Sequence, residues 1–261
     1  MHIVAVYGWQ KEEEAVARMI AEALGILVYE ARQRIAGGGP AVLASFADPL
    51  QAEALAARLS SAGVPALVID SEGVRKQILP CAVRRFVLEK QELRLETMTG
   101  EVCAVDYRTI DLLLVATSSA QTQTTATVTE RQFSLGKTLL SGGVPMSKKV
   151  TREEIVTSLE FDETLWLYAQ GRGPIIFSRS ALNYDGFGAA MQLSRDLNFV
   201  QLRNELQRLA PQAGYDERLL KRASLLRLLG PTLRAESDLD LAFAILSCAL
   251  RAKSTGGAGS R

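Results

Sequence analysis

The stretch Leu24-Gly25-Ile26-Leu27-Val28-Tyr29-Glu30-Ala31-Arg32 lies between two helical patterns near the start of this 261-residue chain. Apolar residues recur at a spacing of four before Gly25, which predicts a helix over residues 11–23 with one inward-facing stripe. Gly25 favours a helix end, because glycine readily adopts the left-handed conformation found there. A second, short helix is predicted over residues 28–35, before the glycines at 37–39. This stretch therefore joins two short helices through a sharp turn.

Three short apolar runs surround these helices and predict strands over residues 2–8, 41–46 and 65–69. A third helix is predicted from Asp48 to Gly63. Asp48 is a good N-cap, and a proline and a glutamine at the first and third following positions complete the helix-start pattern. The start of the chain is thus predicted to be a small domain with the order strand–helix–helix–strand–helix–strand.

Two motifs of this domain carry a family resemblance. The block Val28-Tyr29-Glu30-Ala31-Arg32 matches a Leu-Lys-Glu-Ala-Lys block, and residues 52–63 match an Ala-x-x-Leu helix that ends in Ala-Gly. With these motifs residues 2–70 resemble the C-terminal domain of the bacterial ribosomal stalk protein, and the Clp protease adaptor is similar. The resemblance implies docking, since the first two helices of that family recruit partner proteins with the help of basic residues. It makes Tyr29 and Arg32 candidate binding residues.

The sequence changes character after this domain. Residues 1–72 carry five basic and nine acidic side chains, a net charge of −4, and the remaining 25 basic and 20 acidic side chains give +5. A linker is expected over residues 73–81. Residues 82–212 contain six or seven strand-like segments followed by a helix that Asn198 would cap. This order predicts an α+β fold in which a strongly bent antiparallel sheet, closed by a helix, resembles a pleckstrin-homology-like barrel.

The C-terminal part reads as helical. Two helices are expected within residues 213–252, one over 216–229 and one over 237–252, and a Gly/Ser-rich tail over 253–261 is expected to be disordered. The apolar run at 239–250 contains an aspartate and is too short to span a bilayer core of about 30 Å. A buried core helix is therefore expected there.

The composition argues against most catalytic sites. The single histidine, His2, lies at the chain start, which removes the usual carrier of protons at neutral pH. The three cysteines are widely spaced and show no metal-ligand spacing, as is typical of reduced thiols in a cytoplasmic protein. The N-terminus also lacks the pattern of a secretory signal. We therefore expect a cytoplasmic, non-enzymatic protein without a metal or another cofactor.

A long hairpin is expected over residues 120–160, and its central part is basic. No acidic residue occurs between positions 131 and 152, and this run also carries apolar residues that look exposed. The basic residues of this run are Arg131, Lys137, Lys148, Lys149 and Arg152. Such a run suits an anionic membrane surface or an acidic partner. It argues against nucleic acid, because Phe133 is the only aromatic residue available for stacking on bases. The alternative is a solvated hairpin that packs on the body of the protein.

The same run contains Gly136-Lys137-Thr138, which resembles the end of a phosphate-binding loop. The complete pattern needs a glycine five residues before Gly136, and that position is Arg131. Taken together, the sequence favours a non-enzymatic protein-interaction or regulatory role with a protein partner. The alternatives are a nucleotide- or metal-dependent enzyme that uses this Gly-Lys-Thr segment, and peripheral membrane binding through the basic hairpin.

Overall fold

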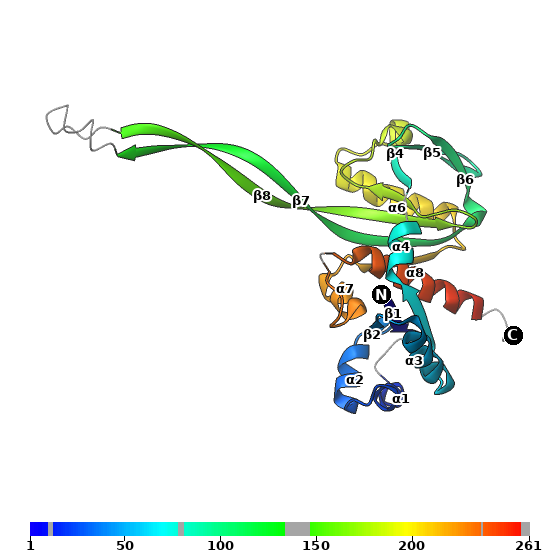
Figure 1. The fold of residues 1–261 in the computed structure, drawn as a ribbon. Coiled ribbons are helices and arrows are strands. Elements are labelled where there is room, and N and C mark those ends of the chain that lie inside the picture. The colour runs from blue at the N-terminus through cyan, green and yellow to red at the C-terminus, as the bar shows by residue number, and fades with distance from the viewer. Residues whose placement is uncertain (10–12, 78–80, 134–146, 236, 257–261) are drawn as a thin grey trace. The chain divides into compact units, whose positions relative to one another are not determined.

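A computed structural model describes residues 1–9, 13–77, 81–133, 147–235 and 237–256 of the chain. Its contacts divide the chain into two units, one formed by residues 1–118 and 162–261 and the other by residues 119–161. Helices accompany a three-stranded and a seven-stranded sheet, so the fold class is α+β, as the sequence predicts (Figure 1). Within the described residues, no helix combines the length and the apolar character needed to cross a bilayer.

The first sheet has the strand order β2-β1-β3, and β1 pairs antiparallel with both neighbours. Its strands are β1 (His2–Val6), β2 (Ala41–Phe46) and β3 (Ala66–Asp70). The helices between them are α1 (Glu14–Leu24), α2 (Val28–Ile35) and α3 (Pro49–Ser61). The first two helices connect β1 to β2, and α3 connects β2 to β3.

Both faces of this sheet are buried, and β1 shows why its sequence is continuously apolar. Successive side chains of a strand point to opposite faces. Val4 and Val6 belong to a core with α1, α2 and α3, whereas Ile3 and Ala5 belong to a second core on the other face. All four side chains are fully buried, with an exposed fraction of 0%. A strand covered on both sides needs no polar alternation, which explains the run of apolar residues.

The start of α3 is the one predicted from the sequence. The Asp48 carboxylate accepts a hydrogen bond from the backbone N–H of Leu50 at 2.9 Å, and Pro49 occupies the first turn. This satisfies one of the N–H groups that a helix leaves unpaired at its start. Leu55 and Leu59 face inward and are buried, so the cap and the apolar stripe both agree with the prediction.

The expected linker over residues 73–81 is partly regular structure. Residues 71–77 form α4 (Ser71–Gln77), and β4 (Cys81–Leu88) begins at the last residue of the expected linker. The Asp70 carboxylate accepts hydrogen bonds from the backbone N–H groups of Glu72 and Gly73, both at 3.1 Å. Asp70 thus supports the first turn of α4 in the way that an N-cap does, a role that the sequence analysis did not assign to it.

The second sheet has the strand order β10-β7-β8-β9-β4-β5-β6. Its strands are β4, β5 (Glu92–Thr97), β6 (Val102–Asp106), β7 (Ile110–Phe133), β8 (Ser147–Ala169), β9 (Ile175–Ser178) and β10 (Gly214–Leu219). The pairs β4–β9 and β7–β10 are parallel, and β4–β5, β5–β6 and β8–β9 are antiparallel. The sheet is therefore mixed and open, with β10 and β6 at its edges, and the prediction of a purely antiparallel sheet is wrong.

Of the hairpin expected over residues 120–160, residues 120–133 lie in β7 and residues 147–160 in β8, and these two strands are neighbours in the sheet. These strands are 24 and 23 residues long. Residues 119–161 of the two strands make up the second unit. The residues between the strands, 134–146, lie outside the described part of the chain.

One face of the second sheet packs on the helix α6 (Arg195–Leu209), and Phe199, Leu202 and Leu206 of this helix are fully buried. The predicted cap at Asn198 is wrong, because Ser194 caps the helix and accepts a hydrogen bond from the Leu197 N–H at 3.2 Å. Asn198 instead lies buried in the first turn, where its side-chain amide holds the preceding loop. Two short 3-10 helices, η1 (Tyr107–Thr109) and η2 (Asp185–Ala190), lie in connections.

The C-terminal region differs from the two helices expected within residues 213–252. Residues 214–219 form the edge strand β10, and only the following α7 (Arg222–Leu229) is helical, so the single helix expected over 216–229 is wrong. Pairing with β7 decides this local structure, and a local pattern does not contain that information. The last helix, α8 (Leu239–Gly256), extends into the tail expected to be disordered. Residues 257–261 of that tail lie outside the described residues.

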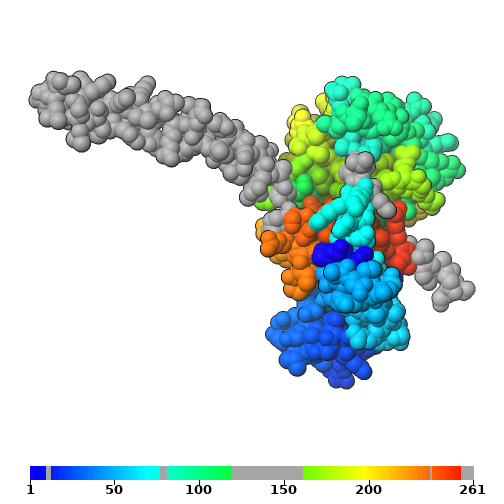
Figure 2. Space-filling view, in the orientation of Figure 1, coloured from blue at the N-terminus to red at the C-terminus, as the bar shows by residue number. Residues whose placement is uncertain are grey.

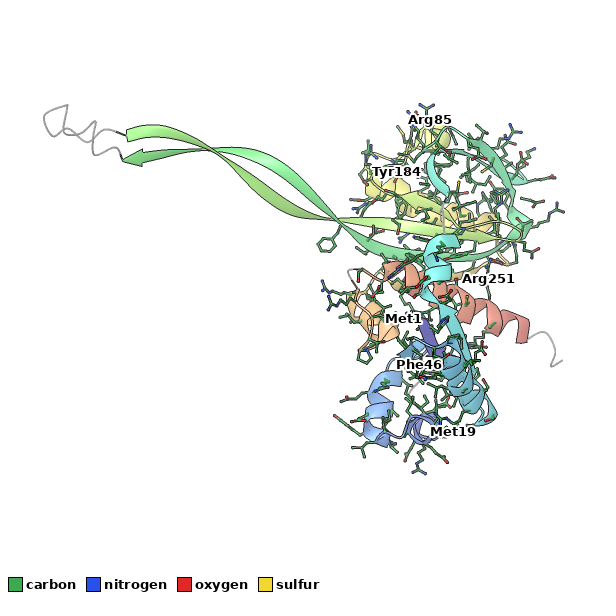
Figure 3. All side chains as sticks on the ribbon, viewed as in Figure 1. Met1, Met19, Phe46, Arg85, Tyr184 and Arg251 are labelled. Carbon is green, nitrogen blue, oxygen red and sulfur yellow. The ribbon has the colours of Figure 1, made fainter. Side chains whose placement is uncertain are left out.

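Helices α7 and α8 share one core with residues of both sheets. This core includes Ile3 and Ile69 from the first sheet and Trp166 from the second. The rings of Trp166 and Phe243 stack with their centroids 3.9 Å apart. Arg251 of α8, labelled in Figure 3, pairs with Asp111 of β7 at 2.7 Å. The C-terminal helices therefore join the two sheets of the larger unit.

Candidate functional site

An exposed apolar segment lies at the start of α2. The exposed fractions of Leu27, Val28 and Tyr29 are 70%, 37% and 68%. We call these three residues the α2 surface. Consecutive helical residues point in different directions, but all three side chains lie at the start of α2 and leave apolar atoms open to a partner there. Tyrosine is also enriched at protein interfaces, because it combines a large ring with a hydroxyl group.

The local sequence explains why this segment is exposed. Ala31 and Ile35 form the inward stripe of α2. Both are fully buried and pack in the core of the N-terminal domain. Tyr29 lies on a different side of the helix, where Gln33, one turn later, donates a hydrogen bond to its hydroxyl at 2.8 Å. Gly25, with φ of 67°, provides the turn that separates α2 from α1. The helix is thus held by its inner stripe, and the α2 surface is left for other contacts.

The second predicted residue of this segment, Arg32, has a structural partner. Its guanidinium lies 3.1 Å from the Glu14 carboxylate of α1, which also pairs with Arg18 at 2.5 Å. Glu14 therefore balances part of the positive charge near α2. Arg32 helps to connect α1 and α2, and Tyr29 is the more accessible of the two predicted binding residues.

A groove of about 410 Å³ adjoins the outer side of α2 and separates it from α7. We call it the α2–α7 groove. It is lined by Glu30, Gln33, Arg34, Leu226, Arg227, Gly230 and Pro231. Leu226 is 46% exposed, and Arg34 donates a hydrogen bond to the Leu43 carbonyl at 2.9 Å. The blue surface of α2 lies next to the orange surface of α7 in the space-filling view (Figure 2). The groove thus combines the apolar side chains of Leu226 and Pro231 with two arginines, one glutamine and one glutamate.

The hairpin residues predicted to bind are placed by their strands. Arg131 lies in β7, and Lys148, Lys149 and Arg152 lie in β8. Lys137 lies outside the described residues, together with the rest of the Gly-Lys-Thr segment. The hairpin cations belong to the second unit, whereas Tyr29 and Arg32 belong to the larger one. A binding role for the hairpin stays a prediction.

Metal chemistry finds no support in the part of the chain that the structure describes. No group of three or more histidine, cysteine, aspartate or glutamate side chains there could hold a metal ion. The side chains of the α2 surface and the α2–α7 groove offer apolar contact, hydrogen bonding and charge. Comparisons of the chain with protein-family models, with curated proteins and with solved structures found no match.

Sequence reasoning missed most of the residues around Tyr29. Leu27 could have been recognised, because it is apolar and precedes the inward stripe of α2. Val28 is in register with the buried residues of this stripe, so its spacing gives no sign that it is 37% exposed. Leu226 and Arg227 carry no such signal. Their place near α2 depends on how α7 packs, and a contact between residues almost 200 positions apart leaves no local pattern in one sequence.

Proposed function

We propose that this chain is a non-enzymatic interaction protein whose N-terminal domain, residues 1–72, docks a segment of a partner protein. The observation that carries the proposal is the α2 surface, in which Leu27 and Tyr29 are about 70% exposed beside a groove. Apolar residues in such a position lose contact with water when a partner covers them, which favours association.

The proposed occupant is a short amphipathic peptide segment with bulky apolar residues and acidic flanks. The apolar residues suit Leu27 and Tyr29 of the α2 surface and Leu226 of the groove, which supply anchoring contacts. The acidic flanks suit Arg34 and Arg227, which outnumber the single carboxylate of the groove, Glu30. Opposite charges steer such a segment and fix its orientation more than they add affinity.

The order of elements in the N-terminal domain supports this proposal, together with the sequence resemblance to the ribosomal stalk C-terminal domain. We extend the proposal to the fold and suggest that residues 1–72 are a relative of that docking domain. Residues 82–212, in which a helix packs on a sheet, would then be a pleckstrin-homology-like partner module. Such modules also serve recognition, although fold alone does not select a partner.

A peptide-display selection tests the proposal directly. The immobilised full-length chain is presented with a library of random peptides, and enriched sequences are measured as free labelled peptides by fluorescence polarisation. We expect enriched peptides to combine bulky apolar residues with aspartate or glutamate. The double variant Leu27→Ser/Tyr29→Ser is expected to bind them at least tenfold more weakly, since exposed aromatic anchors often dominate an interface.

Leu50→Ser is the matched control, because Leu50 is also about 70% exposed but lies on α3. It should bind the selected peptides as the natural chain does. Two outcomes would overturn the docking proposal. One is a selection that enriches no peptide, and the other is a set of peptides that bind the double variant and the natural chain equally well.

A further inference from the structure

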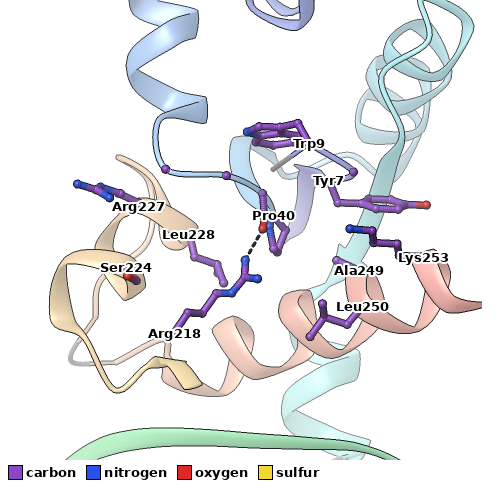
Figure 4. Close-up of a pocket in the computed structure, with 14 residues that line it drawn as sticks. Tyr7, Trp9, Pro40, Arg218, Ser224, Arg227, Leu228, Ala249, Leu250 and Lys253 are labelled. Carbon is purple, nitrogen blue, oxygen red and sulfur yellow. Dashed lines mark hydrogen bonds between the residues drawn. The ribbon is translucent and has the colours of Figure 1, made fainter. Parts of the chain in front are cut away.

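A separate cleft lies between residues of the N-terminal domain and the C-terminal helices (Figure 4). Its volume is about 450 Å³, within the range of pockets that hold small molecules. Its walls come from three parts of the chain: residues 7–9 after β1, the loop at 37–40, and β10, α7 and α8. Any molecule in this cleft would therefore touch both the N-terminal domain and the C-terminal helices.

The loop at 37–40 forms a close-fitting wall. Gly37 has φ of 87°, which residues with a side chain rarely adopt, and a Cβ atom there would lie 2.7 Å from the end of the flexible Arg227 side chain, which would have to shift. A Cβ atom on Gly39 would lie 3.0 Å from the Trp9 ring. Trp9 is itself fixed, because its indole N–H donates to the Ile35 carbonyl at 2.9 Å. The glycines thus allow the backbone to approach Arg227 and Trp9 closely.

The three cations of the cleft differ in how their charge is balanced. Arg218 pairs with Asp216 at 2.8 Å and donates a hydrogen bond to the Gly39 carbonyl, so it is held in place by the protein. Figure 4 shows Arg218 directed at the loop that contains Pro40. Arg227 and Lys253 form no ion pair with any acidic residue of the described chain. The cleft therefore carries an excess of two positive charges.

The other residues that line the cleft indicate which kind of ligand could neutralise these two positive charges. Ser224 precedes Arg227 by one helical turn, so the hydroxyl and the guanidinium lie on the same side of α7. A serine hydroxyl and a guanidinium together are good donors for a phosphate group, which carries a charge of about −2 at neutral pH. Leu228, Leu250 and Tyr7 provide apolar and aromatic surface. These side chains suit the organic part of a ligand and not a bare ion.

We infer that this cleft binds a small organic phosphate of nucleotide size, with its phosphate group at Ser224 and Arg227, its organic part toward Tyr7 and Leu250, and Lys253 as a second cation of the wall. The charge of the ligand would balance the two unpaired cations. The inference concerns a different ligand and a different set of contacts from the α2 surface. Arg227 lines both the cleft and the α2–α7 groove, so Lys253 is the residue that separates the two sites.

Isothermal titration of the full-length chain with defined compounds tests the inference. The probes are nucleoside mono-, di- and triphosphates, glucose 6-phosphate, inorganic phosphate and succinate. We expect saturable binding of at least one organic phosphate, and weaker or no binding of inorganic phosphate and succinate. Raising the salt concentration should weaken the binding, because screening acts on charged contacts that are open to solvent.

Four variants locate the site. Arg227→Gln and Lys253→Gln should each weaken binding at least tenfold, and both residues are exposed, so the fold should be retained. Arg58→Gln, an exposed arginine of α3 outside the cleft, is the matched control and should bind as the natural chain does. Lys137→Gln should also bind normally, which separates the cleft from the Gly136-Lys137-Thr138 segment.

The inference is overturned if none of the organic phosphates binds. It is also overturned if binding depends on Lys137 and not on Arg227 and Lys253, or if Arg58→Gln weakens binding as much as they do. The docking proposal is judged separately, because Leu27→Ser/Tyr29→Ser alters no residue of the cleft. A chain that binds nucleotides but enriches no peptides would support the cleft alone.

Discussion

The three-stranded sheet is covered by two apolar layers that arise in different ways. The layer on one face, which we call the local layer, consists of residues between Val4 and Val64, including Ile20 and Leu59. The layer on the other face, the distant layer, joins Ile3 and Ile69 to α7 and α8, more than 150 positions further along the chain. One face of the sheet is thus covered by helices from the same part of the chain, α1 to α3, and the other face is covered by the C-terminal helices α7 and α8.

This difference shows that a boundary drawn at residue 72 separates the sheet from half of its cover. A fragment of residues 1–72 would expose Ile3, Ala5, Val42 and Ile69, all of which are buried in the complete chain. Exposed apolar surface of this kind destabilises a fragment and favours association. The two layers therefore make different contributions, which single substitutions can measure.

The largest effect is expected in the distant layer, at Phe243. Its ring is fully buried and stacks on Trp166 at 3.9 Å. Phe243→Ala removes this contact and leaves a cavity between the sheets, so the free energy of unfolding should fall by about 3–5 kcal/mol. Urea denaturation, followed by circular dichroism and by tryptophan fluorescence, measures the change.

Leu197→Ala is the control for Phe243→Ala, because Leu197 is 54% exposed on α6. This substitution should change the free energy of unfolding by no more than about 0.5 kcal/mol, as most surface substitutions do. If both variants lose the same small amount, α8 does not pack between the sheets as described, and the distant layer is not a structural core.

The next effect is expected in the local layer, at Leu59. This side chain of α3 is fully buried, so Leu59→Ala should lower the free energy of unfolding by about 2–5 kcal/mol. Arg58→Ala, at the neighbouring exposed position, should cost little. Chemical denaturation of both variants gives the comparison, and equal small losses would show that α3 is not docked on the sheet.

A smaller effect is expected at the start of α3. Asp48→Ala removes the hydrogen bond to the Leu50 N–H, which measures 2.9 Å, and should cost about 1 kcal/mol. Asp48→Asn keeps an acceptor at the same place and should recover most of that stability. A thermal melt of the three chains distinguishes the outcomes. If the asparagine variant is as unstable as the alanine variant, the cap acts through its charge and not through the hydrogen bond.

The two layers also explain how much of the fold the sequence reveals. The cap at Asp48 and the apolar stripe with Leu59 are local signals, and the structure contains both. Residues 216–219 carry a helical pattern but pair with β7 as a strand, and α4 occupies an expected linker. These differences arise where distant segments decide the conformation, because a single sequence does not show which segments meet.

The same reasoning applies to the candidate sites. Tyr29 was predicted because it belongs to a local motif, and the structure places it on an exposed surface. The cleft was not predicted, because Tyr7, Arg227 and Lys253 are brought together only by the packing of α7 and α8. In the sequence they are an isolated tyrosine, arginine and lysine, and nothing near them marks a site.

The smallest effect concerns pH and again separates the two layers. Burial in the distant layer raises the pKa of Tyr168 to about 12, whereas the residues of the local layer include no tyrosine. An unfolded tyrosine has a pKa of about 10. Between these values the folded chain keeps a proton that the unfolded chain loses, so the free energy of unfolding should fall as the pH rises from about 10 to about 12.

Tyr168→Phe tests this source of alkaline sensitivity. The aromatic ring stays beneath Arg251, whose guanidinium carbon lies 5.1 Å from the centre of the Tyr168 ring in the natural chain, but the titrating hydroxyl is gone. At pH 10 the titration of Tyr168 should lower the free energy of unfolding of the natural chain by roughly 0.4 kcal/mol. Between pH 8 and pH 10 the free energy of unfolding of the variant should therefore fall less steeply. Tyr29→Phe, at a position 68% exposed, is the control and should follow the natural chain. Urea denaturation at pH 8, 9 and 10 measures the slopes. If Tyr168→Phe loses stability as steeply as the natural chain, groups outside the distant layer are responsible for the alkaline loss.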